Sequence, residues 1–152
     1  MKAKNNFDVL IIGGGPAGIM AAIASVDFGL NVAILEKNKS LAKKLLLTGG
    51  GRCNITNATF DDKKLTKQYG KEGFFLLPAL KCFDVKKTII FFEKNGLKTK
   101  TEGSKVYCKT DKATDVVNLL EKILKDKKIS VLYGSSVSDI KKAIDILDNY
   151  KD

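Results

Sequence analysis

The chain has no histidine, no tryptophan and a single arginine, Arg52, among its 152 residues. The chain therefore lacks the imidazole side chain that most often acts as a general base near neutral pH and that commonly ligates metals. No apolar stretch approaches the ~18 residues of a membrane-spanning helix. The short apolar run Val9–Ile12 leads into glycines instead of a cleavage site, so it does not resemble the core of a signal peptide.

Cysteine is scarce and shows no pairing pattern. Cys53, Cys82 and Cys108 lie far apart in the sequence and form no CxxC pair, which argues against a zinc ribbon or a thioredoxin-type site. An odd number of cysteines without framework spacing is typical of a reducing compartment. We therefore expect a soluble, cytoplasmic protein without a metal site, in which Cys82 and Cys108 are ordinary buried thiols.

The composition is that of a folded protein, with 44% hydrophobic and 29% charged residues, and the length fits one domain. The net charge of +10 comes mainly from lysines. A lysine surplus can bind nucleic acid, but these lysines are scattered and lack arginine around them. A solvated face is the preferred interpretation, and nucleic acid is not an expected partner.

The first 35 residues follow a strand–turn–helix–strand pattern. Residues 7–12 form an apolar, partly β-branched run typical of a strand that is buried on both faces. Residues 16–28 predict a helix, with Pro16 in its first turn and Gly29 at its end. Residues 31–35 predict a second strand. The pattern predicts a βαβ unit with parallel strands and a right-handed crossover.

The remaining elements are less regular. We expect a short helix over 40–47 capped by Ser40, irregular structure over 48–57, and little periodic structure over 60–82. We also predict a helix over 84–95 capped by Asp84, a hairpin over 97–109 and an amphipathic helix over 111–126. A third buried strand is expected over 129–133, followed by the stretch 137–140. The tail over 141–152 is expected to be weakly helical.

The first candidate site is the GxGxxG run of residues 13–18. It follows a predicted strand and opens a predicted helix, as a dinucleotide-binding turn requires. Gly13 permits the tight turn, Gly15 lets the backbone approach a pyrophosphate, and Gly18 lets the helix pack close to the strand. Glu36 ends the second strand, where its carboxylate can bind the ribose hydroxyls of an adenosine and repel a 2′-phosphate. The alternative is a glycine-rich turn of another α/β fold.

The second candidate site is the glycine loop of residues 48–57, TGGGRCNITN. Consecutive N–H groups with Lys44 and Arg52 nearby suit an anionic or carbonyl-bearing part of a ligand. The alternative is a flexible surface loop. Cys53 has no second cysteine five residues further on, where Ala58 stands, so a redox disulfide is excluded and Cys53 is a packing or ligand-contacting residue.

The stretches DVLIIGGGPAGIMAAI (8–23), NVAILEKN (31–38) and KKLLLTGGGRCNITN (43–57) resemble the start of a bacterial flavoprotein family. Its members are NAD(P)/FAD-dependent oxidoreductases of the aminoacetone-oxidase-like or BaiN-like kind. Residues 91–120 resemble its next section more weakly. The chain differs from the family at Ala42, where Gly is usual, and at Cys108, where Pro is usual. The GGGRCNxTN run is the more specific of its motifs.

The resemblance implies an α/β fold of the glutathione-reductase type: a Rossmann-like FAD-binding βαβ unit, an incomplete parallel sheet and a small hairpin and helix region. Residues 1–142 would be the N-terminal portion of the FAD-binding domain and 143–152 a charged tail. The implied cofactor is FAD. Its implied binding residues are Gly13, Gly14, Gly15, Pro16, Ala17, Gly18, Glu36, Lys37, Lys44, Gly51, Arg52, Cys53 and Asn54.

The resemblance also implies a function. The leading hypothesis is the FAD-binding portion of an oxidoreductase that passes hydride from NAD(P)H to the flavin and then to an unknown acceptor. Family members are much longer, so we expect a truncated form that binds FAD weakly at most and is inactive alone. The main alternative is a non-catalytic dinucleotide-binding module that needs a partner chain. A third, weaker hypothesis is an RNA-linked flavoprotein. No side chain stands out as acid, base or nucleophile.

Overall fold

A computed structural model describes residues 6–140 of the chain. They divide into two compact units, one containing residues up to Leu41 and from Leu124 onward, the other containing Ala42–Ile123. None of the helices among these described residues combines the length and the apolar character that crossing a bilayer requires.

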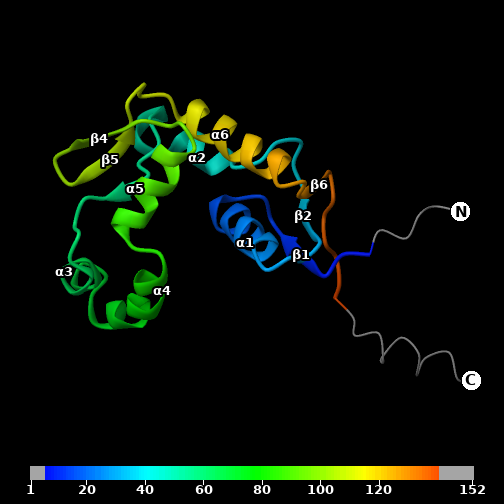
Figure 1. The fold of residues 1–152 in the computed structure, drawn as a ribbon, viewed down its shortest axis with the longest axis horizontal. Helices are drawn as coiled ribbons and strands as arrows, with labels where there is room; N and C mark the ends of the chain where they lie inside the picture. Colours follow the sequence, from blue (N-terminus) through cyan, green and yellow to red (C-terminus); the bar gives the residue numbers. More distant parts are fainter. Residues whose placement is uncertain (1–5, 141–152) are drawn as a thin grey trace, which may run out of the picture. The chain divides into compact units, whose positions relative to one another are not determined.

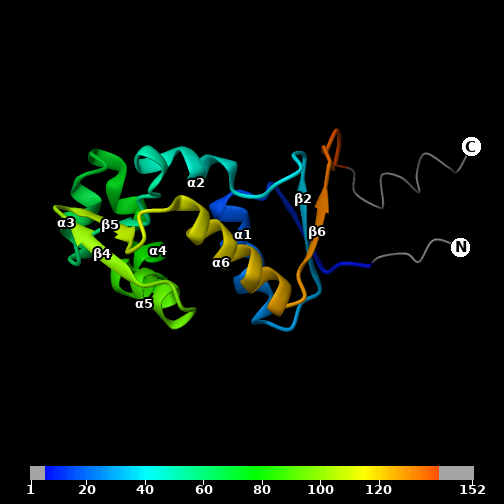
Figure 2. The same cartoon turned by 90° about the horizontal axis from the view of Figure 1, so that it is seen from above.

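The first unit is a parallel sheet with one crossover helix (Figure 1). Its elements are β1 (Val9–Ile12), α1 (Pro16–Val26), β2 (Val32–Glu36) and β6 (Ser130–Tyr133). The strand order is β1-β2-β6, and both pairings are parallel. Figure 2 shows β2 and β6 side by side although about 100 residues separate them in the sequence. The predicted βαβ unit and third strand are therefore confirmed.

The sheet is covered on one face only. Helix α1 contacts β1 and β2 and buries Ile19, Ala22 and Ile23 completely or almost completely. On the opposite face of β1, the side chains of Leu10 and Ile12 are 55% and 56% exposed. The prediction that β1 is buried on both faces is wrong, because no second layer lies over that face within the described residues of this unit. The residues of β6 are likewise intermediate or exposed instead of buried.

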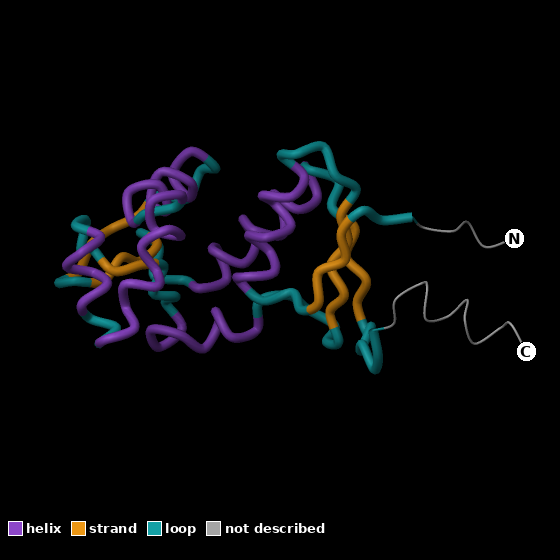
Figure 3. The backbone as a smooth tube through the Cα atoms, turned by 90° about the horizontal axis from the view of Figure 1, so that it is seen from below, coloured by secondary structure: helices purple, strands orange, loops and turns teal. Residues whose placement is uncertain are grey.

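The second unit combines short helices with a small antiparallel sheet (Figure 3). Strands β4 (Thr99–Glu102) and β5 (Lys105–Cys108) form the predicted hairpin, and β3 (Thr56–Asn57) pairs with β5 on its other side. The strand β3 interrupts a stretch predicted to be irregular. Helix α5 (Val85–Lys94) contacts β3 and β4, and α6 (Ala113–Asp126) begins in this unit and ends in the first.

The short 3-10 helix η1 (Thr48–Gly51) lies in the stretch predicted to be irregular. Three further helical segments between residues 62 and 82 were not expected from the sequence: α3 (Asp62–Lys67), the 3-10 helix η2 (Lys71–Leu76) and α4 (Leu77–Cys82). Each has six residues, too few for an apolar stripe to repeat, and all three pack against one another. Cys82 ends the last of them and is exposed, so its predicted burial is wrong. The stretch 137–140 forms no strand, and the predicted tail 141–152 lies outside the described residues.

The predicted cap of the helix over 40–47 is also wrong. Helix α2 covers Lys43–Leu47, and its N-cap is Ala42, with φ of +52° and no side-chain hydrogen bond. Since Ala42 adopts the left-handed conformation, the helix begins three residues after Ser40, which therefore cannot serve as the cap. By contrast, the carboxylate of Asp84 accepts a hydrogen bond of 2.6 Å from the backbone N–H of Lys87 and caps α5 as predicted.

Candidate functional site

The glycine turn connects the end of β1 to the first residue of α1. Gly13 has φ of +100°, which L-residues with a side chain rarely adopt, and its N–H donates to the carbonyl of Leu35 at 2.8 Å. Gly15 is the N-cap of α1, and Pro16 occupies the first helical turn. The turn is therefore tight at Gly13, as predicted, and its second half leads directly into the helix.

The other glycines of the turn differ in the space around them. A Cβ on Gly18 would lie 2.0 Å from the carbonyl oxygen of Gly13 and 3.2 Å from Cγ2 of Ile11, so α1 approaches β1 as closely as predicted. A Cβ on Gly14 would lie 2.2 Å from Cδ2 of Leu41. A Cβ on Gly15 would meet nothing within 4 Å. Space beside the backbone is therefore open at Gly15.

The N-terminus of α1 has no cap from a side chain. Gly15 offers none, and the first turn contains no acidic residue. The first N–H groups of a helix have no partner within the helix, and the helix dipole gives this end a partial positive charge. Pro16 and Ala17 are exposed. This end of α1 is open and suits an anion such as a pyrophosphate.

Glu36 lies at the end of β2 and is only 7% exposed. One carboxylate oxygen accepts from the N–H of Gly14 at 2.8 Å, and the other accepts from the N–H and the side-chain amide of Asn38 at 2.8 and 2.6 Å. The backbone N–H groups of Asn38 and Gly14, in that order, hold the pKa of Glu36 below its usual range, so the carboxylate is charged at neutral pH. The exposed Lys37 adds to this shift.

These contacts limit how Glu36 can receive a ribose. A carboxylate has about four acceptor positions, and three are occupied by Gly14 and Asn38. A second ribose hydroxyl therefore requires the side chain of Asn38 to move. Asn38 was not identified from the sequence, although an asparagine two residues after a strand-ending glutamate is well placed to form such a turn.

The second glycine loop is sharply bent. Gly49, Gly50 and Gly51 have φ of +58°, +66° and +85°, and Cys53 has φ of +58°. Two of its N–H groups are used internally, since Arg52 donates to Gly49 at 3.4 Å and Cys53 to Thr48 at 3.1 Å. The sites predicted at Lys44, Gly51 and Asn54 are exposed. The loop is therefore accessible, but fewer of its amides face outward than the motif implied.

Cys53 and Cys108 are 1% and 0% exposed. Burial raises the pKa of the Cys53 thiol, which disfavours the reactive thiolate. The burial predicted for Cys108 is confirmed, and the burial of Cys53 agrees with a packing role. No group of three or more metal-ligating side chains gathers anywhere within residues 6–140.

Arg52 interacts with groups distant in the sequence. Its guanidinium stacks 4.1 Å above the ring of Tyr107, forms an ion pair of 2.7 Å with Glu102, and lies 3.6 Å from a carboxylate oxygen of Asp111. These partners were missed because the sequence gives no sign of which residues the hairpin brings to the loop.

The predicted site residues fall into two groups. Residues 13–18, Glu36 and Lys37 lie together in the first unit, at the carboxyl ends of β1 and β2. Residues 44 and 51–54 lie in the second unit. Ligands of open α/β sheets bind at the carboxyl ends of the strands. The first group thus lies at the edge of the sheet where such ligands bind, and the second is a separate loop.

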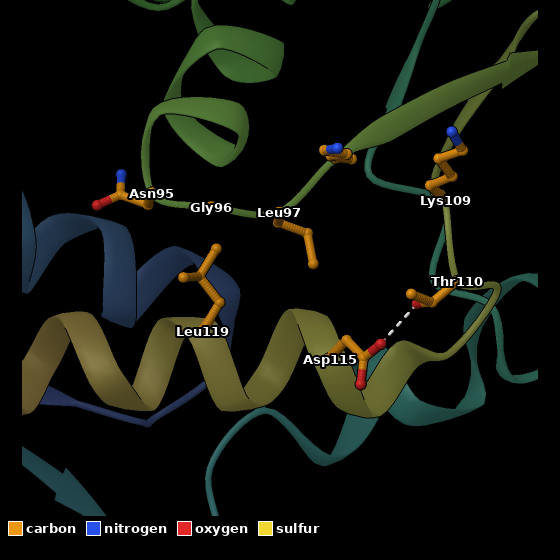
Figure 4. A pocket seen from close by; sticks show the side chains of 8 residues that line it. Asn95, Gly96, Leu97, Lys109, Thr110, Asp115 and Leu119 are labelled. Carbon is orange, nitrogen blue, oxygen red and sulfur yellow. Dashed lines mark hydrogen bonds between the residues drawn. The ribbon is translucent and has the colours of Figure 1, made fainter.

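The second unit also contains a hollow of about 460 Å³ between α5, β4 and the start of α6 (Figure 4). Leu97 and Leu119 line its apolar part, and the Asp115 carboxylate accepts a hydrogen bond of 2.6 Å from Thr110. None of the predicted site residues lines it.

Two curated relatives match over most of the chain. The sequence is 40% identical over 133 residues to the 3-dehydro-bile acid delta(4,6)-reductase of Clostridium scindens, covering 86% of this chain and 32% of the relative. It is 32% identical over 116 residues to the ribosomal RNA dihydrouridine synthase of Escherichia coli, covering 75% of this chain and 28% of the relative. The chain thus spans about a third of the length of these relatives.

Solved structures support the same fold. The open conformation of a flavocytochrome c3 fumarate reductase aligns with 91% of this chain and 28% of its own, with a TM-score of 0.57 and 22% sequence identity. The family described as "HI0933-like protein Rossmann domain" matches residues 7–149. These findings agree with the parallel sheet and glycine turn described above. The chain therefore belongs to the HI0933-like family of flavoprotein oxidoreductases, as the resemblance to the BaiN-like and aminoacetone-oxidase-like proteins predicted.

Proposed function

We propose that this chain is the FAD-binding portion of a flavin-dependent oxidoreductase. The observation that carries the proposal is the glycine turn 13–18, whose uncapped helix end stands next to the charged carboxylate of Glu36. The N–H groups at the start of α1 bind the pyrophosphate, and the open space beside Gly15 lets it approach the backbone. Glu36 binds the adenosine ribose.

The chain's own residues bind and orient the cofactor. FAD supplies hydride transfer when it is bound, from NAD(P)H to the flavin and on to an acceptor. Glu36, held charged by Gly14 and Asn38, favours a ribose with free hydroxyls and repels a 2′-phosphate. From the family resemblance we also propose that Lys44 and residues 51–54 bind the flavin part of FAD.

The relatives' names indicate a substrate class. A delta(4,6)-reductase of 3-dehydro-bile acids and a synthase of dihydrouridine are both named for reduction of a carbon–carbon double bond conjugated with a carbonyl. Hydride adds to the carbon distant from the carbonyl, and a proton completes the reduction. We propose this class of activated alkene as the substrate of the oxidoreductase in which this domain acts.

A dinucleotide-binding module that works with a second chain is the alternative function. The exposure of Leu10 and Ile12 on the uncovered face of β1 favours it, because apolar side chains in a sheet are usually covered. Reductase activity of the pure chain with NAD(P)H would exclude this alternative.

The proposal is tested by titrating FAD with the chain and following the fluorescence anisotropy of the flavin, with circular dichroism to verify the fold. ADP should displace FAD, because the binding residues contact its adenosine diphosphate half. ADP with a 2′-phosphate should displace it at least about ten-fold less effectively, because of the charge on Glu36. Equal displacement by both would contradict the role of Glu36, and failure of ADP to compete would contradict the site.

A further inference from the structure

Four charged side chains form a closed ring beside the second glycine loop. Arg52 pairs with one oxygen of Glu102 at 2.7 Å, and the other oxygen of Glu102 pairs with Lys100 at 2.8 Å. Lys100 pairs with one oxygen of Asp111, whose second oxygen lies 3.6 Å from Arg52. Positive and negative groups alternate around the ring, so each charge has two neighbours of opposite sign.

The hairpin explains how these groups meet. Lys100 and Glu102 are two residues apart on β4 and therefore point to the same face. Tyr107 stands directly opposite Lys100 on β5 and shares that face. Arg52 stacks on the Tyr107 ring at 4.1 Å, and a Cβ added to Gly49 would lie 3.0 Å from the same ring. Tyr107 thus contacts the loop at both Gly49 and Arg52.

Asp111 occupies its place in the ring at a cost. Its φ of +58° lies in the left-handed region, which Asp and Asn tolerate better than other residues with a side chain. One of its carboxylate oxygens is buried and has no hydrogen-bond partner within the described residues. A buried charged oxygen without a hydrogen bond persists only when its surroundings compensate for it. Here the surroundings are the two cations of the ring.

The glycines of the loop do little to hold it in one conformation, whereas its last residue, Cys53, is buried and donates a hydrogen bond of 3.1 Å to Thr48. Three consecutive glycines lose more conformational freedom on ordering than other residues, and no side chain of theirs can pack. The internal hydrogen bond from Arg52 to Gly49 is long, at 3.4 Å. Buried Cys53 holds one end of the loop, and the glycines before it depend on contacts outside the loop, which the charge ring and Tyr107 provide.

We propose that Lys100, Glu102 and Asp111 are positioning residues: through Arg52 and together with Tyr107, they fix the loop Thr48–Cys53 before the cofactor arrives. This inference rests on the proposed function, in which the loop extends toward the flavin. A loop that is ordered in advance loses less entropy on binding, so the ring increases the affinity for FAD. The raised pKa of Lys100 and the lowered pKa of Glu102 agree with mutual stabilisation of the charges.

Hydrogen–deuterium exchange of the loop amides, measured on the full chain without FAD, tests the ordering directly. Glu102→Gln removes one anion, and Asp111→Asn removes the other while keeping a residue that tolerates positive φ. Exchange of Gly49–Cys53 should become about three- to ten-fold faster in each variant, as local opening becomes easier. The control is Asp27→Asn, which breaks the exposed ion pair with Lys127 in the other unit and should leave the loop unchanged.

Salt and cofactor binding separate the possible outcomes. In 1 M salt the Debye length is about 3 Å, so the ion pairs of the ring are screened. Exchange of the loop amides in the unmodified chain should then become nearly as fast as in the variants. The exchange rates of the variants should change little with salt. If exchange is the same in all four proteins, the ring does not order the loop and the inference is wrong. If exchange is faster in Glu102→Gln and Asp111→Asn but their affinity for FAD is unchanged, ordering of the loop does not contribute to FAD binding. If the unmodified chain does not bind FAD, the proposed function fails, while exchange still decides whether the ring orders the loop.

Discussion

Glu36 and Gly14 stand 22 residues apart and are joined by a hydrogen bond of 2.8 Å between the carboxylate and the backbone N–H. This bond links the glycine turn to the end of β2 before any ligand binds. The sequence indicated both residues, because the glycine pattern and the acidic residue after the second strand follow general rules. The sequence did not indicate Asn38. The turn of the chain after β2 determines which residue donates to the second carboxylate oxygen of Glu36, and the sequence does not show that turn.

Replacing Glu36 should change the pH dependence of stability. The folded pKa of Glu36 is lowered, so its contribution to stability is present above the unfolded pKa of about 4.3 and is lost as pH falls through the folded pKa. We expect Glu36→Gln to lower the free energy of unfolding by about 1–3 kcal/mol at pH 7, because hydrogen bonds to a charged carboxylate are replaced by hydrogen bonds to a neutral amide. The difference should shrink below pH 4. Urea unfolding at several pH values measures it, and a difference that does not depend on pH would contradict the assignment.

Gly18 and Gly15 should respond differently to alanine. Because a Cβ on Gly18 meets the backbone oxygen of Gly13 at 2.0 Å, Gly18→Ala should destabilise the chain by about 1–3 kcal/mol or more. Gly15→Ala places its Cβ in open space at an ordinary φ of −80° and should change stability by no more than about 0.5 kcal/mol. Thermal unfolding of both variants checks this contrast. Equal losses of stability would show that the turn is packed differently.

At the scale of elements, the sequence predicted best where a helix has both a cap and an apolar stripe. The helix begun by Asp84 was placed to within a residue at each end, and its Val85 and Phe92 are buried. The segments between Phe60 and Cys82 were missed, because six-residue helices depend on packing against one another and not on periodicity. The partners of Arg52 were missed for a related reason: they meet only after the hairpin has folded.

The two predicted caps provide a test of this distinction. Asp84→Ala removes the hydrogen bond to the N–H of Lys87 and should lower the free energy of unfolding by about 1 kcal/mol. Ser40→Ala is the matched control and should have an effect within about 0.5 kcal/mol, since Ala42 and not Ser40 precedes α2. Urea unfolding followed by far-UV circular dichroism measures both. A larger loss from Ser40→Ala than from Asp84→Ala would contradict the helix boundaries.

In the molecule as a whole, the parallel sheet has three strands with β2 in the centre, and within the described residues of the first unit one face of β1 is uncovered. The resemblance to longer flavoproteins predicted an incomplete sheet of this kind, and the chain spans about a third of the length of its curated relatives. Leu10 and Ile12 lie exposed on that face. The periodicity of β1 alone could not reveal it, because a continuous apolar run is equally typical of a strand covered on both faces.

Replacing the exposed side chains of Leu10 and Ile12 should reduce non-specific hydrophobic association of the chain without unfolding it. Leu10→Thr with Ile12→Thr places a β-branched residue at both positions of β1 and removes apolar area that is already in water. We expect less binding of a hydrophobic dye, less self-association in light scattering, and a change in unfolding free energy of no more than about 1 kcal/mol. Loss of more than about 3 kcal/mol would mean that these side chains are buried in solution.

The central claim is that the turn of residues 13–18 binds FAD, and a titration of FAD with the unmodified chain and with Gly15→Ala tests it most directly. The unmodified chain should bind FAD saturably, though weakly, while the variant should bind at least about ten-fold more weakly with an unchanged fold. Circular dichroism and thermal unfolding of the same samples verify the fold. A folded chain that shows no saturable binding, or a Gly15→Ala variant that binds as well as the unmodified chain, would contradict the claim.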